Sequence, residues 1–443
     1  MLLKDASAFL DDFSKKSYTD IFNIRSRVEQ KDWERNAITN IKEHIFQGVN
    51  KYSTTKNVLY VHIPFCATRC DYCPYYTTPY NHTLVNEYIS CLKKEMNRYK
   101  NTPYLKSTTF SSVYFGGGTP SILTVEQIKE IGEHILNSFT FDSNAELSFE
   151  SNPSTLTLPK IKILKSLGFN RVSLGIQTFN ERLLKSMNCA HNKEKGIAVI
   201  RQLLENNFIV NADLIFGLTG QDNKDIEEDI RILSQFEGSL QVTYFPLRIA
   251  ENTPLAKQLE TEEELSIGAH LKHLLKIDAF IENKLSSNGF IREECPVFYH
   301  SSGASEHKYH STETRVIGFG SSAGTLLDEA ENCNFFDIYE YMKNVDSDSS
   351  TALSGIMLTQ QQAMERFVLY RLLYMNRSLP NFKNLMEERF FEYYQTPLND
   401  LYEKVLNDML KLRFIRLNGE KIELTNRFWR ILNKVKIGMP SII

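Results

Sequence analysis

The chain has 443 residues, of which 42% are hydrophobic and 24% charged, and this ordinary globular composition excludes disorder as the dominant state. Its formal net charge of −3 provides no overall basic field, so we expect no nucleic-acid partner. No apolar run is long enough to cross a membrane, and the first residues are polar and acidic, so we expect a cytoplasmic protein with neither a membrane span nor a secretory signal.

Residues 1–55 precede the first strong strand signal and are predicted to form an N-terminal extension. Strand-like runs then alternate with helix-like runs. The expected strands are 58–63, 112–115, 145–149, 171–177, 209–218 and 240–247, and the expected helices include 83–100, 124–138, 193–206 and 224–235. This alternation is typical of βαβ units with a parallel sheet. Six such units predict an α/β core that forms a partial or full (β/α) barrel.

Beyond the barrel, a long helix is expected over 262–288, followed by a polar loop over 293–314 that is rich in His and Ser. Ser and Asp cluster at 345–355, which predicts a linker. The core with its elaboration would then cover 56–344. Residues 356–443 are predicted to be helices followed by a hairpin at Asn418-Gly419, a winged-helix-like domain for which we favour packing over DNA contact.

Three of the seven cysteines, Cys66, Cys70 and Cys73, lie within eight residues and directly after the first predicted strand. A loop at a strand end can wrap three thiolates around one metal centre. Iron–sulfur clusters normally take four thiolates, so three would leave one iron of a [4Fe–4S] cluster open for chemistry. On spacing alone, a zinc site of these three cysteines with His62 remains an alternative.

The cysteine motif resembles that of radical S-adenosylmethionine (SAM) enzymes. The flanking Tyr-Val-His-Ile-Pro-Phe-Cys at 60–66 is similar to one branch, the oxygen-independent coproporphyrinogen III oxidase and haem chaperone (HemN/HemW) family. Further motifs follow in that family's order: Phe-Gly-Gly-Gly-Thr-Pro at 115–120, Phe-Glu-Ser-Asn-Pro at 149–153, a Gly-to-Phe segment at 168–179, Asp-Leu-Ile-Phe-Gly-Leu at 213–218 and Gly-Phe-Gly-Ser-Ser-Ala at 318–323. The resemblance covers roughly residues 55–440.

This resemblance implies that Cys66, Cys70 and Cys73 hold a [4Fe–4S] cluster whose fourth iron binds SAM. The SAM-binding positions that it implies are Tyr60, Tyr72, Gly117, Gly118, Thr119, Glu150, Gln177, Asp213 and Gly324. Of these, Gly118, Thr119, Gln177 and Asp213 match contacts to a second SAM in the oxidases, so one or two SAM molecules are expected. Most of these polar residues lie near the carboxyl ends of predicted strands, the face of a (β/α) barrel that carries active sites. No residue is assigned to catalysis on the substrate.

Two positions depart from the family pattern. Tyr75 replaces a fourth cysteine found in some coproporphyrinogen oxidases, and Cys189 replaces an Arg that contacts the second SAM. A thiol cannot pair bidentately with a carboxylate as a guanidinium does. The polar loop contains His300, His307 and His310, which could ligate haem iron or bind its propionates, or could simply be solvated.

The resemblance therefore implies a radical SAM enzyme that acts on a tetrapyrrole and receives electrons from a flavodoxin-like donor. Haem, methylated or opened, is the favoured substrate. Oxidative decarboxylation of coproporphyrinogen III and a haem chaperone that binds SAM and haem remain alternatives.

Overall fold

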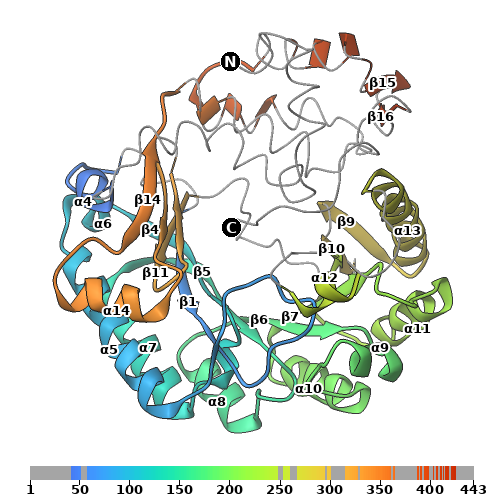
Figure 1. Cartoon of the computed structure of the whole chain (residues 1–443), viewed down its shortest axis with the longest axis horizontal. Helices are drawn as coiled ribbons and strands as arrows, with labels where there is room; N and C mark the ends of the chain where they lie inside the picture. Colours follow the sequence, from blue (N-terminus) through green and yellow to red (C-terminus); the bar gives the residue numbers. More distant parts are fainter. Residues whose placement is uncertain are drawn as a thin grey trace.

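The computed structural model describes residues 41–50, 57–247, 253–259, 267–294, 297–300, 315–327 and 330–360, with scattered residues between 363 and 425. Within these ranges, six strands form a parallel sheet in chain order (Figure 1): β1 (Asn57–Ile63), β4 (Thr109–Gly117), β5 (Thr140–Ser151), β6 (Arg171–Gln177), β7 (Ile209–Phe216) and β8 (Leu240–Pro246). Every predicted strand is present. The sheet confirms the predicted α/β core of βαβ units.

Further strands extend this sheet at both ends. Next to β1 lie the parallel strand β11 (Arg315–Phe319) and then the antiparallel strands β12 (Gly324–Leu326), β13 (Ala330–Asn334) and β14 (Ala352–Met357). Next to β8 lie the antiparallel strands β10 (Val297–His300) and β9 (Phe290–Glu294). Because the strand order starts at β14 and ends at β9 without returning, the barrel is open, which confirms the prediction of a partial barrel.

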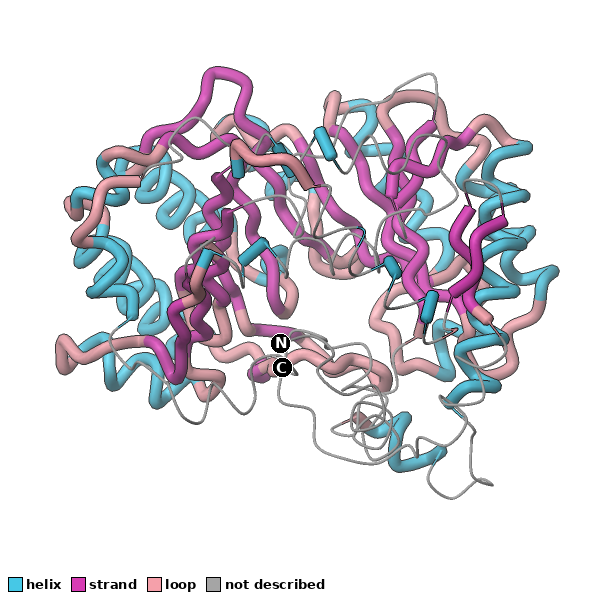
Figure 2. Tube along the Cα trace, turned by 90° about the horizontal axis from the view of Figure 1, so that it is seen from above, coloured by secondary structure: helices cyan, strands magenta, loops and turns pink. Residues whose placement is uncertain are grey.

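Helices cover the outer side of the curved sheet, as Figures 1 and 2 show. They are α5 (His82–Tyr99), α7 (Val125–Ser138), α8 (Leu158–Ser166), α10 (Lys193–Glu205), α11 (Asn223–Leu233) and α13 (Ile267–Ser287). Polar caps fix where several of them begin: the Asn81 side chain caps α5, and reciprocal capping boxes begin α7 at Thr124 and α11 at Asp222. The long helix predicted from residue 262 is described from Ile267.

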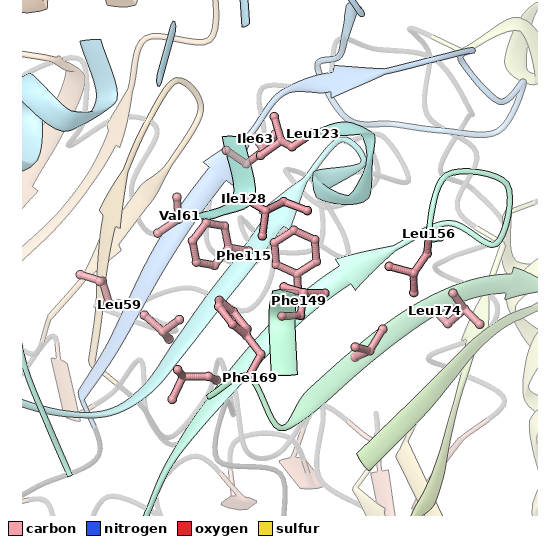
Figure 3. Packing of buried hydrophobic residues seen from close by; sticks show 14 of the residues in the cluster. Leu59, Val61, Ile63, Phe115, Leu123, Ile128, Phe149, Leu156, Phe169 and Leu174 are labelled. Carbon is pink, nitrogen blue, oxygen red and sulfur yellow. The ribbon is translucent and has the colours of Figure 1, made fainter. Parts of the chain in front are cut away.

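Side chains alternate between the two faces of the parallel strands, as a strand's period of two requires. Val61, Phe115 and Phe149 are paired in register and pack against the helices, together with Phe169 (Figure 3). The rings of Phe115, Phe149 and Phe169 lie 5.3–5.6 Å apart, centroid to centroid. The intervening residues face the inner side and are largely polar: Tyr60, His62, Tyr114, Ser148, Glu150, Ser173, Asn211, Asp213 and Thr243. The inner face is therefore suited to polar ligands.

Part of the predicted N-terminal extension belongs to the core. Helix α4 (Ile41–Phe46) buries Ile41 and Phe46 completely, and its Lys42 Nζ lies 2.9 Å from Glu95 Oε1 of α5. The helix lies beside β13 and β14, strands from the far end of the chain. Residues 41–46 of the predicted extension thus pack onto the core, and an amphipathic six-residue helix gives too short a pattern to reveal this burial from the sequence.

The predicted linker at 345–355 is also not a linker. It contains the end of α14 (Ile338–Asp346) and most of β14, which pairs with β13 and buries Ala352 and Ile356. The polar residues 347–350 form only the turn between these two elements. The division of the chain into domains at 344 and 356 remains a prediction.

The hairpin predicted at Asn418-Gly419 is confirmed by β15 (Ile415–Asn418) and β16 (Lys421–Leu424), which pair antiparallel. Among the helices described, none combines the length and apolar character that a membrane crossing requires.

Candidate functional site

The three clustered cysteines lie at the carboxyl end of β1, on a loop whose base is closed by a short strand pair. Strand β2 (Phe65–Cys66) pairs in parallel with β3 (Thr78–Pro79), and Tyr80 N donates to Cys66 O at 3.0 Å. Within the loop, Cys73 N donates to Cys70 O at 3.2 Å, which brings these two residues together in a turn. A local fold thus presents Cys66, Cys70 and Cys73 from one loop, and all three are partly exposed.

The cysteine loop spans the rim formed by the carboxyl ends of the parallel strands. On one side, Asp71 N donates to Met187 O at 3.2 Å, and Leu255 N of α12 (Pro254–Leu259) donates to Asp71 O at 3.0 Å. On the other side, the Tyr76 ring stacks on Phe336, with centroids 5.0 Å apart. The loop therefore contacts both ends of the open barrel.

The environments of the three thiols differ. Burial raises the pKa of Cys66, although a 3.3 Å contact between its Sγ and Thr119 Oγ1 opposes this shift. Burial also raises the pKa of Cys73 to about 11. By contrast, a hydrogen bond with the Cys189 thiol lowers the pKa of Cys70. Because metals bind thiolates, metal binding would release protons at Cys66 and Cys73.

The donor set fits an iron–sulfur cluster. Three sulfur donors come from one loop. His62 is the fourth ligand of the zinc alternative, and its Nδ1 lies 3.0 Å from the Tyr60 hydroxyl, with which it forms a hydrogen bond. Its Nε2 is buried and has no hydrogen-bond partner among the described residues. Among the described residues, no three His, Cys, Asp or Glu side chains are already arranged to hold a metal ion.

The glycine-rich turn follows β4 and packs against the end of β1. A Cβ atom at Gly117, whose φ is +113°, would lie 2.7 Å from the His62 ring, and one at Gly118 would lie 2.8 Å from Phe65 O. Thr119 N donates to Phe65 O at 2.8 Å, which places the Thr119 hydroxyl against Cys66. The protein's own packing thus requires both glycines, whether or not a ligand approaches their backbone.

Glu150, near the end of β5, is tied to the glycine-rich turn. Its carboxyl accepts hydrogen bonds from the Tyr114 hydroxyl at 2.8 Å and from Gly117 N at 3.2 Å. Burial raises its pKa to about 8 despite these bonds, and the charge of Asp213 contributes to the increase. The Glu150 carboxyl is consequently protonated at neutral pH unless a cation approaches it.

Asp213 of β7 is the second acid of the inner face. It accepts hydrogen bonds from the Ser173 hydroxyl at 2.8 Å and from Asn211 Nδ2 at 2.7 Å, and Thr243 donates to Asn211 at 2.9 Å. Burial raises the pKa of Asp213 to about 6. Three adjacent strands therefore hold this carboxyl in place, and the charge of Arg171 opposes the rise of its pKa.

Gln177 ends β6 with a left-handed backbone, φ +66°, which is strained for a residue other than glycine. The turn behind it is held by Asp229 of α11, whose carboxylate accepts from Phe179 N at 2.7 Å, from the Thr178 hydroxyl at 2.9 Å and from the Tyr244 hydroxyl at 3.1 Å. Sequence reasoning missed Asp229. A single acid on an amphipathic helix gives no signal that it is buried.

The two tyrosines implied by the resemblance occupy different surroundings. Tyr60 stacks on Tyr114, with ring centroids 6.2 Å apart, and so lies beside Glu150 on the inner face. Tyr72 packs instead against an apolar cluster at the ends of β6–β8, made of Leu183, Met187, Ile215, Leu218 and Leu247. Burial and then the neighbouring Cys70 thiol hold the pKa of Tyr72 well above its usual value.

The remaining predicted site residues lie elsewhere in the sheet. Gly324 begins β12. Its carbonyl oxygen lies close to Gly318, and a Cβ atom added to Gly318 would lie 2.4 Å from that oxygen. His300 ends β10 and packs edge-on against Phe290, with ring centroids 5.0 Å apart. His307 and His310 lie outside the described residues. The rim thus brings together the cysteines, Gly117, Gly118, Thr119, Glu150, Gln177 and Asp213.

Comparison with known proteins places this arrangement in context. The radical SAM superfamily model matches residues 60–233. A haem chaperone HemW of Buchnera aphidicola subsp. Schizaphis graminum is 27% identical over 405 residues, 87% of this chain and 96% of its own. An anaerobilin synthase of Escherichia coli O157:H7 is 32% identical over 232 residues, 51% of this chain and 52% of its own.

The solved structure of the coproporphyrinogen III oxidase HemN of Escherichia coli, described as a radical SAM enzyme, matches with a TM-score of 0.68 at 24% identity, covering 88% of this chain and 92% of that one. This likeness shows the shared open-barrel fold. The chain therefore carries a radical SAM domain, and its homologues include HemW haem chaperones and oxygen-independent coproporphyrinogen III oxidases.

Proposed function

We propose that this protein is a radical SAM enzyme that acts on a tetrapyrrole, with haem as the favoured substrate. Cys66, Cys70 and Cys73 would hold a [4Fe–4S] cluster, and the inner face beside them would bind SAM. The observation that carries the proposal is the pair Glu150 and Asp213, two partly buried carboxyls with raised pKa values near the cysteine loop. Such a pair favours a cationic ligand, and SAM carries an ammonium and a sulfonium group.

When bound, the cluster would supply the electron for reductive cleavage of SAM, which yields the 5′-deoxyadenosyl radical that abstracts a hydrogen atom from the substrate. The chain's own residues would bind and orient the two reactants. Glu150 would ionise as the cation arrives, while Tyr114 and Gly117 N would hold its carboxylate in place. The rim would exclude water around them. A flavodoxin-like donor in the cytoplasm would provide the electron. The inner face would bind one or two SAM molecules.

A second candidate is a haem chaperone that binds SAM and haem without turnover. The similarity to HemW supports it, because that relative matches along 87% of this chain, whereas the anaerobilin synthase matches along 51%. Decarboxylation of coproporphyrinogen III is supported less well, since Tyr75 stands where some oxidases have a fourth cysteine.

One anaerobic experiment separates these candidates. Reconstituted protein is incubated with SAM, a reductant and either haem or coproporphyrinogen III, and 5′-deoxyadenosine and tetrapyrrole products are measured. We expect haem-dependent cleavage of SAM and a modified haem. Stoichiometric haem binding without SAM cleavage would support the chaperone, and release of carbon dioxide from coproporphyrinogen III would support the oxidase.

A haem titration of the same protein, followed by its absorption spectrum, tests the predicted histidines. If His300, His307 and His310 ligate haem iron, replacing all three with Ala should shift the Soret band. An unchanged band would show that these residues are only part of a solvated segment.

A further inference from the structure

Contacts between their flanking residues place Cys189 beside Cys70, although the two residues lie on different segments. The two thiols interact, which lowers the pKa of Cys70 and raises that of Cys189. Cys189 follows α9 (Glu181–Ser186) in the loop before α10, where its backbone N donates to Leu184 O at 3.0 Å. Both residues are partly exposed and neither is in a disulfide, so small reagents can reach them.

Backbone contacts hold the two segments together independently of the thiols. Asp71 N, one residue after Cys70, donates to Met187 O at 3.2 Å, and Asn188 Nδ2 donates to Arg69 O at 3.4 Å. Each residue that flanks Cys70 is thus bonded to a residue just before Cys189. The thiol contact is a consequence of this docking, and it does not require the cluster.

We propose that Cys70 and Cys189 form a reversible disulfide when the cluster is absent, and that this bond closes the cluster site until a thiol reductant reopens it. The inference rests on the proposed function only in naming Cys70 as a cluster ligand. The oxidant is a low-molecular-weight disulfide such as oxidised glutathione. One cysteine thiolate attacks it and releases one glutathione thiol, and the second cysteine then displaces the other glutathione. Two protein thiols are oxidised, and two electrons and two protons pass to glutathione.

The consequence follows from the number of ligands. A three-cysteine loop has no spare thiolate, so a disulfide at Cys70 prevents cluster assembly. The same bond protects Cys70 from irreversible oxidation to sulfinic acid in a chain that has lost its cluster. The oxidised chain would be stored in a form that can assemble the cluster again once the disulfide is reduced.

The test uses the full cluster-free chain treated with oxidised glutathione, followed by alkylation, digestion and mass spectrometry. We expect the loss of two of the seven thiols and a peptide pair joined through Cys70 and Cys189, both reversed by a thiol reductant. The Cys189→Ser and Cys70→Ser variants should lack this linked pair. Cys91→Ser and Cys333→Ser are matched controls that should keep it, because those thiols lie against oxygen atoms of Asp346 and Ser322.

Other outcomes would overturn the proposal. A dominant Cys70–Cys73 or Cys66–Cys70 bond, a disulfide between two chains, or an alkylated Cys189 in the oxidised protein would each do so. Iron uptake by oxidised wild-type chain before reduction would contradict the closure of the site.

A parallel sample loaded with iron and sulfide tests the underlying assignment separately. If Cys70 is a cluster ligand, the loaded protein should resist the oxidant. If the loaded protein forms the Cys70–Cys189 bond as readily as the cluster-free chain, the disulfide stands and the assignment of Cys70 to the cluster fails.

Discussion

Two glutamates in this molecule, Glu95, which is completely buried, and Glu150, which is partly buried, have opposite electrostatic surroundings. Glu95 lies between α5 and the β11–β14 edge, where it is ion-paired to Lys42 and also accepts bonds from Gly320 N, Tyr341 and Thr351 at 2.7–2.8 Å. Glu150, at the rim, accepts bonds from Tyr114 and Gly117 N and has the negative Asp213 nearby. Burial alone would raise both pKa values, but Lys42 and the hydrogen bonds lower that of Glu95, whereas that of Glu150 rises to about 8.

The difference separates a carboxylate that holds the fold from one that awaits a ligand. Glu95 is fully compensated within the protein, so its charge contributes to folding. Glu150 has donors but no compensating cation among the described residues that it bonds, so its charge is costly until a ligand supplies one. Both residues are glutamates enclosed by the fold, and their partners account for the opposite pKa shifts.

The largest expected effect concerns the cysteines that make the rim a cofactor site. Replacing Cys66, Cys70 or Cys73 with Ala should remove essentially all bound iron, against about four iron and four sulfide per chain in the wild type. Metal and sulfide analysis after anaerobic reconstitution provides the measurement. Cys91→Ala and Cys333→Ala should bind iron normally, and full loading of Cys70→Ala would refute the cluster assignment.

The next prediction concerns stability. Glu95→Gln should lower the free energy of unfolding by about 3–5 kcal/mol, because it leaves Lys42 as an uncompensated buried charge. Glu150→Gln should change it far less, since the wild-type carboxyl is already protonated at neutral pH. Denaturant titration of both variants measures the two effects, and equal losses would contradict our distinction between the two glutamates.

At the rim, Glu150→Gln should weaken SAM binding by about 1.5–3 kcal/mol, roughly ten- to a hundredfold, the contribution of a hydrogen bond to a charged group. Calorimetry with cluster-loaded protein measures it. Asp142→Asn, an exposed acid on the same strand, is the control. Gly117→Val would be a poor probe, because its side chain would strike His62 even without a ligand.

The pH dependence should have opposite signs at the two glutamates. Glu150 binds its proton more tightly in the folded chain, so its contribution to stability falls as pH rises from about 4.5 to about 8, and SAM affinity should rise over the upper part of that range. Glu95 has a lowered pKa, so its contribution is present above about 4.5 and is lost in acid. In plots of unfolding free energy against pH, Glu95→Gln should lose the decrease in acid, and Glu150→Gln should lose the decrease between about 4.5 and about 8. A SAM affinity independent of pH would count against the role of Glu150.

The smallest effect is expected at Asp229, a completely buried carboxyl that holds the turn after Gln177. Asp229→Asn keeps an acceptor for Phe179 N but weakens the bonds to two hydroxyls, so SAM binding should fall by about 1 kcal/mol through Gln177. Glu227→Gln, on the exposed side of α11, should leave binding unchanged. An effect on folding alone would show that the turn does not position a ligand contact.

The sequence predicted the parallel core well because its strands are apolar runs bounded by turn residues, and β6 was predicted to the residue. Strands β11–β14 were missed since each is short and separated from the next by polar turns. The site residues came from motif resemblance. The spacing of residues in the sequence could not predict which distant segments come together. These are Cys70 with Cys189, Gly117 with His62, and Asp229 with the turn after Gln177.

The buried pair of Lys42 and Glu95 also has a consequence for how the chain acquires its fold. Lys42 Nζ donates to Gly318 O as well as to Glu95, and a Cβ at Gly355 would lie 2.7 Å from Ile41. The first described helix thus closes against strands made some 300 residues later, a contact of high sequence separation that delays folding. During synthesis, the helix cannot complete this packing until β14 emerges, so its apolar face stays exposed meanwhile, although Glu95 emerges much earlier.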